Sequence, residues 1–206
     1  MASLMYSPPV DAIFDYATLA EVKGHLAATT TAQDGHIGDL ISRVSRFIDQ
    51  YKKVPPSYFN NGGLYAEHWP LYFDGNGLEK LWISPCTALV SVLLDAVAMV
   101  ENTDFLTWPY NSTPKWRLDM MPTQGNTWTE WQKNVEVDAY WGGYTDTPEE
   151  IKEACIILTA RMLQGGQNMF ADQSAITELG QVMMTDPLNA QARALLNSVP
   201  GMMHIG

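Results

Sequence analysis

The residues of this sequence that could do chemistry are few and widely spaced. Apart from carboxylates, they are His25, His36, His68, His204, Cys86 and Cys155. The histidines show no HExxH spacing and the cysteines form no close pair, whereas protein metal sites often draw their ligands from such short spacings. We therefore expect no metal and no cofactor. We interpret the cysteines as structural thiols of a protein that works in a reducing compartment.

The carboxylates offer no clearer catalytic set. Asp34 and Asp39 flank His36, but a polar residue at the start of a helix explains that histidine better than an acid–base site. His68 lies in an aromatic stretch, where partial burial explains it better than a ligand role. Four carboxylates of the middle region lack a spacing that pairs them for general acid–base work, and a solvated face accounts for them as well. These are Asp119, Glu130, Glu136 and Asp138. No GxxxxGK loop or GxSxG elbow occurs, and we expect no enzyme.

The charge balance excludes another class of function. The formal net charge is −11, and the largest basic cluster is the pair Lys52 and Lys53. A surface that grips nucleic acid needs clustered lysines and arginines, so a nucleic-acid-binding role is disfavoured. No apolar run is long enough to predict a membrane span, and we expect no signal peptide, because no basic flank precedes an apolar block.

A long amphipathic helix is predicted over residues 34–51, and the rest of the chain is organised around it. Its apolar residues recur every three or four positions, which is the spacing of one helical face. They are Ile37, Leu40, Ile41, Val44, Phe47, Ile48 and Tyr51. Pro55 and Pro56 should stop the helix, because proline lacks the backbone N–H. We expect Val44 and Phe47 to be buried against a later helix over residues 151–162.

Capping signals place the remaining helices. Thr18 and Glu21 form a capping-box pattern that opens a short helix ending near Leu26. Residues 147–150, Thr-Pro-Glu-Glu, open the helix over 151–162, and the glycines at 165–166 should end it. A further helix is predicted over 174–184. Asp186-Pro187 opens a last one, which the proline and glycine at 200–201 end and which bears Leu188, Ala192, Leu195 and Leu196.

The middle region, residues 57–145, is predicted to be mostly β-structure. Residues 74–77, Asp-Gly-Asn-Gly, lie between two apolar runs and predict a hairpin loop. Residues 88–100 could form a helix or one or two buried strands, and the proline at 85 and the polar residues at 101–104 favour strands. Shorter strands are expected over 107–110, 116–120 and 135–140. All seven tryptophans fall in this region. We expect most of them in the core and some at the surface or in a subunit contact. Because aromatic clusters also stack on sugars, a carbohydrate-binding or other aromatic-rich β interaction module is the alternative function.

The predicted fold class is therefore α+β, a helical bundle with an inserted, mainly antiparallel β domain. The expected organisation is an N-terminal arm over 1–15, a helical core over 16–56 and 146–198, the β region over 57–145, and a C-terminal tail over 199–206. The arm and the tail carry apolar residues without a periodic face, which is typical of segments that contact a partner.

Three stretches together resemble a known family. Residues 16–26 lead into the long helix that ends in Phe-Ile-Asp-Gln-Tyr at 47–51. Residues 135–144, Val-Glu-Val-Asp-Ala-Tyr-Trp-Gly-Gly-Tyr, run through Thr-Pro-Glu-Glu-Ile-Lys-Glu-Ala at 147–154, and residues 188–196 follow. Their order and spacing resemble the head–tail connector, or adaptor, proteins of tailed bacteriophages. The segment around residues 73–85 is similar to the β insertion that some of these connectors carry.

The resemblance implies a structural protein of the virion neck, assembled in the host cytoplasm. Such proteins form a ring, commonly a dodecamer, between the portal and the stopper or tail-completion protein, and DNA passes through the ring without being read during genome ejection. The expected portal or partner contacts are Leu4, Met5, Tyr6, Val199, Met202, Met203, His204 and Ile205. The expected carboxylates of the channel wall are Asp39, Asp49, Glu149, Glu150 and Glu153.

Overall fold

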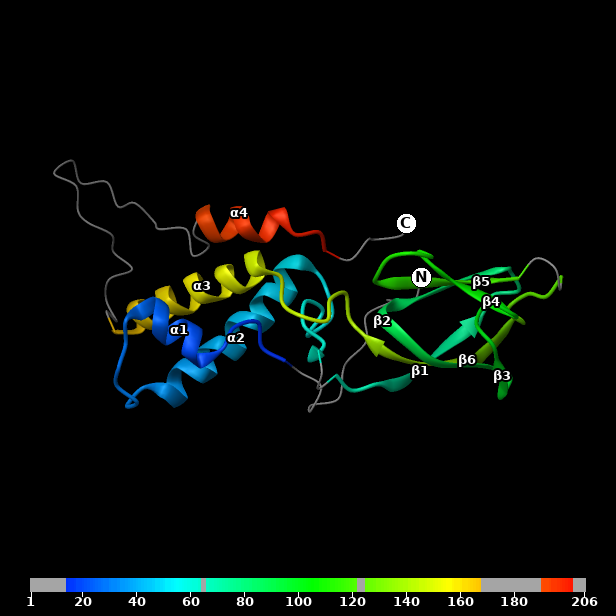
Figure 1. The fold of residues 1–206 in the computed structure, drawn as a ribbon, viewed down its shortest axis with the longest axis horizontal. Helices are drawn as coiled ribbons and strands as arrows, with labels where there is room; N and C mark the ends of the chain where they lie inside the picture. The colour runs from blue at the N-terminus through cyan, green and yellow to red at the C-terminus, as the bar shows by residue number, and fades with distance from the viewer. Residues whose placement is uncertain (1–13, 64–65, 122–124, 168–189, 202–206) are drawn as a thin grey trace. The chain divides into compact units, whose positions relative to one another are not determined.

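The computed structural model describes residues 14–63, 66–121, 125–167 and 190–201. The chain divides into two compact units, and each is built from segments that are distant in the sequence. The helical unit comprises Asp15–Lys53 and Thr147–Gly206, and the β unit comprises Met1–Phe14 and Val54–Asp146. The fold is therefore α+β, and the β strands enter the chain between the second and third helices (Figure 1).

The first two helices follow their capping signals. Helix α1 spans Leu19–Leu26, and both hydrogen bonds of the predicted capping box form between Thr18 and Glu21. Helix α2 spans Asp34–Lys52 and ends at Lys53, whose φ of 55° is left-handed. The N–H of Lys53 donates to carbonyls of the last turn, so a left-handed cap ends α2 before the chain reaches Pro55.

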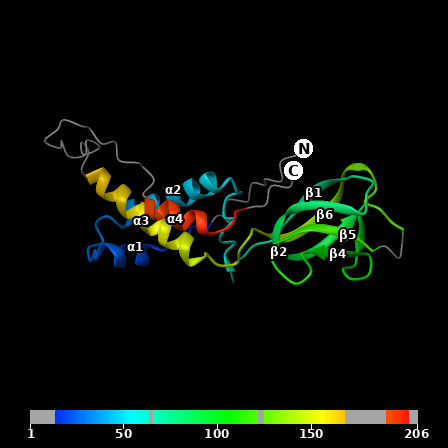
Figure 2. The ribbon, with the colours of Figure 1, turned by 90° about the horizontal axis from the view of Figure 1, so that it is seen from above.

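Helix α3 is the centre of the helical unit. It spans Glu149–Gln167 and packs against α1, α2 and α4, which spans Ala190–Ser198 (Figures 1 and 2). The prediction that the glycines at 165–166 end this helix is wrong, because α3 continues through them to Gln167. Helix α4 ends at Ser198, before the proline and glycine at 200–201 as predicted, and its predicted start lies outside the described residues. The helix expected over 174–184 lies outside the described residues.

Small side chains on α3 decide what α2 buries. Val44 and Ile48 are buried, but Phe47 is 44% exposed, so its predicted burial is wrong. The Sγ of Cys155 lies 3.7 Å from the Oγ of Ser45, so two small side chains meet at this point between α3 and α2. The residues in the middle of the apolar face of α2 are buried, whereas Phe47, a large side chain at the edge of that face, is exposed to solvent. Met162, placed by the sequence on the same buried face of α3, is 48% exposed.

The six strands form one sheet in the order β1-β6-β2-β5-β4, and β3 pairs with β2. The bounds are Trp69–Gly75 for β1, Lys80–Leu94 for β2, Val97–Met99 for β3, Phe105–Trp108 for β4, Lys115–Met120 for β5 and Trp131–Trp141 for β6. All the pairings are antiparallel.

Strand β6 lies between β1 and β2, so the prediction of a hairpin at residues 74–77 is wrong. The turn instead packs on β6 and on the segment that leads into it. Gly75 N–H donates to the side chain of Asn134 in β6 at 2.9 Å, and Gly77 N–H donates to the Trp128 carbonyl at 2.7 Å. These contacts satisfy the backbone that a hairpin would have paired.

Strand β2 is a single strand of 15 residues, which the sequence had divided at Pro85. The register of its pairing with β5 shifts between Trp82 and Cys86. A proline cannot donate to a strand ladder, and such irregular positions are where a sheet tolerates one. The residues expected to form one or two strands over 88–100 end β2 and then form β3.

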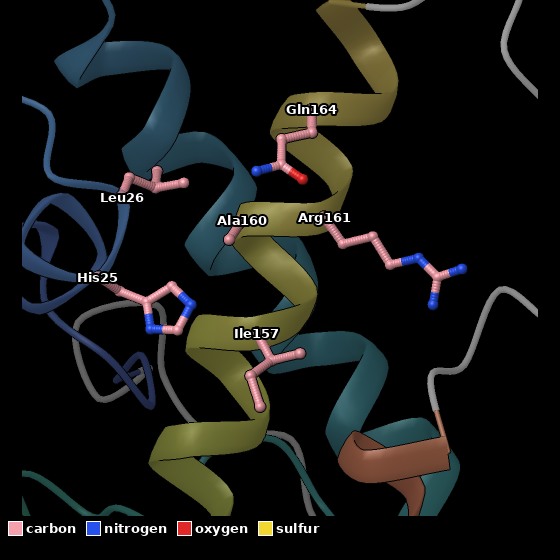
Figure 3. Close-up of a pocket in the computed structure, with 6 residues that line it drawn as sticks. All are labelled: His25, Leu26, Ile157, Ala160, Arg161 and Gln164. Atoms are coloured by element: carbon pink, nitrogen blue, oxygen red, sulfur yellow. The ribbon is translucent and has the colours of Figure 1, made fainter.

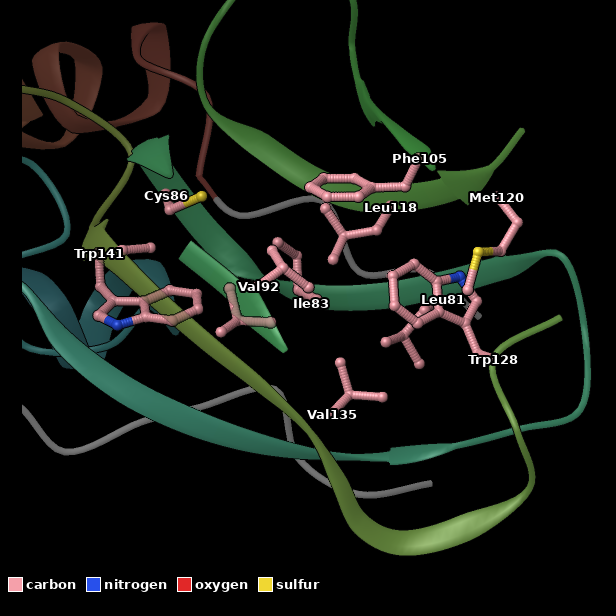
Figure 4. Close-up of a cluster of buried hydrophobic side chains, with 12 residues drawn as sticks. Leu81, Ile83, Cys86, Val92, Phe105, Leu118, Met120, Trp128, Val135 and Trp141 are labelled. Atoms are coloured by element: carbon pink, nitrogen blue, oxygen red, sulfur yellow. The ribbon is translucent and has the colours of Figure 1, made fainter. Parts of the chain in front are cut away.

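The core of the β unit lies on one face of this curved sheet (Figure 4). Alternate residues of β2, β5 and β6 point into it, including Leu81, Leu118 and Val137, which are almost fully buried. Only two tryptophans belong to this core, Trp128 and Trp141. The expectation that most tryptophans are core residues is therefore wrong: Trp131 is 71% exposed and the other four are partly buried.

Candidate functional site

The carboxylates proposed for a channel wall differ in their exposure to solvent. Asp39, Glu149 and Glu150 are exposed and Glu153 is half-buried, as surface groups require. Glu149 accepts a hydrogen bond from Lys152 at 2.8 Å, which raises the pKa of that lysine. Asp49 is different: it is buried, so we remove it from the set of surface carboxylates.

Asp49 belongs to a buried polar network that ties the start of the helical unit to α2. The Tyr16 hydroxyl donates to one oxygen of Asp49, and Arg46 lies 3.0 Å from the other. The Arg46 guanidinium also lies over the Tyr16 ring, 5.6 Å from its centroid. The N–H of Tyr16 donates to the Ser45 hydroxyl at 3.0 Å. A buried carboxylate needs such partners, because an unpaired buried charge is costly.

Negative charge is distributed unequally between the two units. Among the described residues, the helical unit has eight Asp and Glu side chains and eight Lys and Arg side chains, whereas the β unit has eleven acidic and four basic ones. Two of those four basic residues are engaged locally. Lys115 donates to the carbonyls of Pro109 and Tyr110, and Arg117 pairs with Asp119. The acidic surface of the described chain is therefore mainly a property of the β unit.

The C-terminal end of α4 is held by α2. The Lys52 ammonium donates to the carbonyls of Leu196 and Val199 at 3.0 and 2.8 Å, and the Tyr51 hydroxyl donates to Asn197 at 3.2 Å. Val199, expected to contact the portal, is buried within its own unit. The other expected contact residues lie outside the described residues. They are Leu4, Met5, Tyr6, Met202, Met203, His204 and Ile205.

An arginine and several aromatic rings form a cluster at the β2–β5–β4 side of the sheet. Trp82 and Trp116 stack with an interplanar angle of 1° and centroids 5.1 Å apart. The Arg117 guanidinium lies within 6 Å of the ring centroids of both, and 4.8 Å from that of Trp108. The register explains two of these contacts, because Arg117 is opposite Trp82 on one side and Trp108 on the other, and Trp116 is its neighbour in the chain. Residues on neighbouring strands in register project from the same face.

His68 is paired with a carboxylate rather than partly buried. Its Nδ1 lies 3.0 Å from the Asp138 carboxylate, its ring meets Tyr140 edge-on, and its side chain is 45% exposed. His25 and His36 are exposed. Within the described residues, no group of three or more His, Cys, Asp and Glu side chains could hold a metal ion. No helix in the described part of the chain is long and apolar enough to cross a membrane.

The helical unit has an open hollow between α1 and the second half of α3 (Figure 3). Its volume is about 450 Å³. It is lined by His25, Leu26, Ile157, Ala160, Arg161 and Gln164. His25 and Leu26 come from α1 and the other four from α3, with the Arg161 side chain extending away from His25 (Figure 3). We call this feature the α1–α3 hollow.

Comparison with solved structures finds the same fold in a virus-like particle. A chain of the "Virion of native gene transfer agent (GTA) particle" matches with a TM-score of 0.55 and 15% sequence identity, and 97% of each chain is covered. The resemblance drawn from the sequence is confirmed at the level of the fold. This chain has the fold of a chain of the gene transfer agent virion. A second match, from the "Neck of native GTA particle computed with C12 symmetry", has a TM-score of 0.49 and 14% identity, and covers 91% of this chain and 90% of that one.

Sequence comparison adds no relative. No family model matches the chain, and no curated protein matches it. The likeness to the virion chain extends over both the helical and the β unit, since almost the full length of each chain is covered.

Proposed function

We propose that this chain is a structural protein of the neck of a tailed-phage-like particle, and not an enzyme. The observation that carries the proposal is the match to a chain of the gene transfer agent virion over 97% of both chains. In this role the chain forms an oligomeric ring that joins the portal at the head vertex to the stopper or tail. Negative-stain imaging of the purified protein tests the ring, and a monomer that does not associate with portal-bearing heads would contradict the role.

DNA is a passive cargo in this proposal. Eleven acidic side chains against four basic ones give the β unit a repulsive field, and the described part of the helical unit has no excess of positive charge to oppose it. The exposed carboxylates Asp39, Glu149 and Glu150, with Glu153, add local negative charge to the helical surface. We expect no appreciable affinity for random duplex DNA at physiological salt in a mobility-shift assay. A tight or salt-resistant complex would contradict passive passage.

The C-terminal end is the proposed portal contact. Because Val199 is buried and its carbonyl accepts from Lys52, a useful truncation leaves both in place and removes only residues 202–206. This truncation should weaken capture of the protein by portal-bearing heads without changing its thermal unfolding. The matched control is removal of residues 1–6, which tests the arm in the same assay. Unchanged capture after the C-terminal truncation would move the portal contact elsewhere on the chain.

One alternative function is a carbohydrate-binding β module. It is favoured by the Arg117 cluster, which consists of Arg117, Trp82, Trp108 and Trp116. Stacked, half-buried tryptophans are the side chains on which sugar rings pack. The rings of Trp82 and Trp116 are, however, stacked on each other and covered by Arg117, so we rank this role second. Glycan-array binding that Trp82→Ala abolishes, with no association with heads, would reverse the ranking.

A further inference from the structure

Strand β1 is the longest strand at an edge of the described sheet. It has seven residues and pairs with β6 alone, whereas the other edge strands, β4 and β3, have four and three residues. Residues 69–73, Trp-Pro-Leu-Tyr-Phe, carry no charged side chain. A long, uncharged edge is a template for a further strand, and folded proteins usually cover it. The edge of β1 therefore needs a covering segment.

The backbone of Tyr72 points away from the sheet. In β6 the carbonyl of Asn134 faces β2, because it accepts a hydrogen bond at 2.9 Å from the N–H of the first residue after β2. Backbone groups point to alternate sides along a strand, so Val137 faces β1. Leu71 is opposite Val137 and faces it, and Tyr72 therefore presents its N–H and carbonyl at the open edge. Pro70 faces the same way, which is where a sheet tolerates a missing N–H.

A segment of suitable composition precedes the described residues. Residues 1–7, Met-Ala-Ser-Leu-Met-Tyr-Ser, have no charged side chain, no proline and no glycine, and Pro8 and Pro9 follow. Because proline cannot donate to a strand ladder, this pair limits a strand to the residues before it. Residues 2–7 have the usual length of a strand, and nearly the length of β1.

The first described residue, Phe14, is fixed to the β unit. Its N–H donates to the Ser57 hydroxyl at 2.8 Å, and its ring lies against Gly62, where a Cβ has no room. The chain that leads back to residues 1–7 therefore starts from an anchor in the same unit as β1.

This anchor lies at the end of the sheet where β1 begins. The side chain of Asn61, next to the glycine of the anchor, donates to the Thr87 hydroxyl at 2.8 Å. Thr87 in turn donates to the carbonyl of Tyr140 in β6 at 3.2 Å. Trp69, the first residue of β1, pairs with Ala139, the neighbour of Tyr140.

Direction and reach both suit a pairing with β1. The chain traced back from Phe14 runs along β1 from its first residue to its last, so residues 2–7 in chain order are antiparallel to β1. Every pairing of this sheet is antiparallel. Residues 8–13 span up to about 20 Å when extended. Neighbouring strands lie about 4.8 Å apart, so the path from β2, beside the anchor, to the outer side of β1 is about 15 Å.

We propose that residues 2–7 pair with β1 of their own chain as an additional antiparallel strand of the sheet. The short tether of residues 8–13 favours the same chain, because it gives a roughly millimolar effective concentration at the edge. The added strand covers Leu71 and Phe73, which pack on the core but are only partly buried. The inference is independent of the neck function, and it makes residues 1–7 a part of the β unit and not a contact for the portal.

Amide hydrogen exchange, measured residue by residue by NMR, tests the pairing in the full chain. Removal of residues 1–7 should speed the exchange of the Tyr72 amide at least tenfold, because this N–H loses its acceptor. The Leu71 amide, which faces β6, is the internal control and should exchange at the same rate in both proteins. Removal of residues 202–206 is the matched truncation and should leave both amides unchanged. Equal rates at Tyr72 with and without residues 1–7, or equal acceleration at both amides, would overturn the inference.

Disulfide trapping tests the same contact without removing the segment. Tyr72→Cys is combined with one substitution at a time in the segment, which are Ser3→Cys, Leu4→Cys, Met5→Cys and Tyr6→Cys. Successive side chains of a strand point to opposite faces, so only alternate positions, 3 and 5 or 4 and 6, should form a disulfide within one chain. The matched control replaces Tyr72→Cys with Val97→Cys, an exposed position in β3, and should give no disulfide. Bonding at all four positions, at none, or between two chains would contradict the pairing.

Discussion

Lys52 donates to the carbonyl oxygen of Val199 at 2.8 Å, although 147 residues separate the two in the chain. The same ammonium donates to Leu196, so one side chain satisfies two of the carbonyls left open where α4 ends. A cation in this place also opposes the negative end of the helix dipole. Because α4 has only nine residues, too few to be a stable helix alone, its position depends on contacts of this kind.

Replacing Lys52 should therefore loosen α4. In Lys52→Met the two carbonyls lose their donor, and we expect amide hydrogen exchange in residues 190–198 to accelerate by about tenfold, corresponding to the roughly 1.5 kcal/mol of a charged hydrogen bond. Partial burial lowers the pKa of the Lys52 ammonium. Lys53→Met removes the same charge from the next, exposed residue and should leave α4 unchanged. Equal effects of the two variants would show that net charge, and not the cap, holds α4.

Neighbouring residues on α2 should differ sharply in their contribution to stability. Ile48→Ala empties a fully buried site and should cost about 2–5 kcal/mol of unfolding free energy. Phe47→Ala removes a larger side chain, yet it should cost less than about 1.5 kcal/mol, because that ring is 44% exposed. Urea denaturation of the two variants under conditions that keep the chain monomeric makes the comparison. A larger loss for Phe47 than for Ile48 would mean that the ring is buried.

The error at Phe47 shows what periodicity can and cannot predict. The three- and four-residue spacing correctly predicted α2 and most of its buried face. It could not show that Cys155 of α3 meets Ser45 of α2, or that Phe47 and Met162, at the border of the predicted faces, are exposed. The shape of the packed helix surfaces, and not the hydrophobicity of Phe47 and Met162, determines whether these two side chains are buried.

The sequence correctly predicted that the middle region is β-structure, but it did not predict which strands pair. Alternation correctly predicted the strand within β6, and turn residues correctly predicted a bend after β1. Which strands pair depends on contacts between residues far apart in the sequence, and a local pattern does not reveal them. Strand β6 pairs with both β1 and β2 and lies between them. The cluster around Arg117 was missed for the same reason. Trp82 and Trp108 meet Arg117 through the β2–β5–β4 register, and the signal available in the sequence was only that Arg117 lies among tryptophans.

The buried network around Asp49 should be essential for the helical unit. Asp49→Ala leaves the Tyr16 hydroxyl and the Arg46 guanidinium without this acceptor, and the expected loss is about 3–5 kcal/mol. Asp39→Ala, at an exposed position on the same helix, should change stability by less than about 0.5 kcal/mol. Thermal unfolding at pH 7 compares the two. Similar melting temperatures would mean that Asp49 is solvated in solution.

The two cysteines should be unreactive towards thiol reagents in the folded protein. Burial raises the pKa of the Cys86 thiol to about 12 and that of Cys155 to about 11, so almost no thiolate exists at pH 8. We expect no colour with an aromatic disulfide reagent until the chain is unfolded in guanidinium, when both thiols react. The folded pKa values lie above the unfolded value of 9.0, so the folded state is favoured below pH 9 and loses stability as the pH rises towards 11. Rapid reaction of either thiol at pH 8 without denaturant would contradict its burial.

The position of β6 between β1 and β2 has a consequence for how the chain is made. As the polypeptide leaves the ribosome, β1 and the second half of β2 must wait for residues 131–141 before their shared partner exists. The helical unit waits longer still, because α2 is complete at residue 52 but α3 begins only at residue 149. The apolar face of α2 is therefore exposed through the synthesis of nearly a hundred residues, and the β unit can close before the helices do. A nascent chain of this protein should accordingly engage holdase chaperones until α3 emerges, and be released once it does.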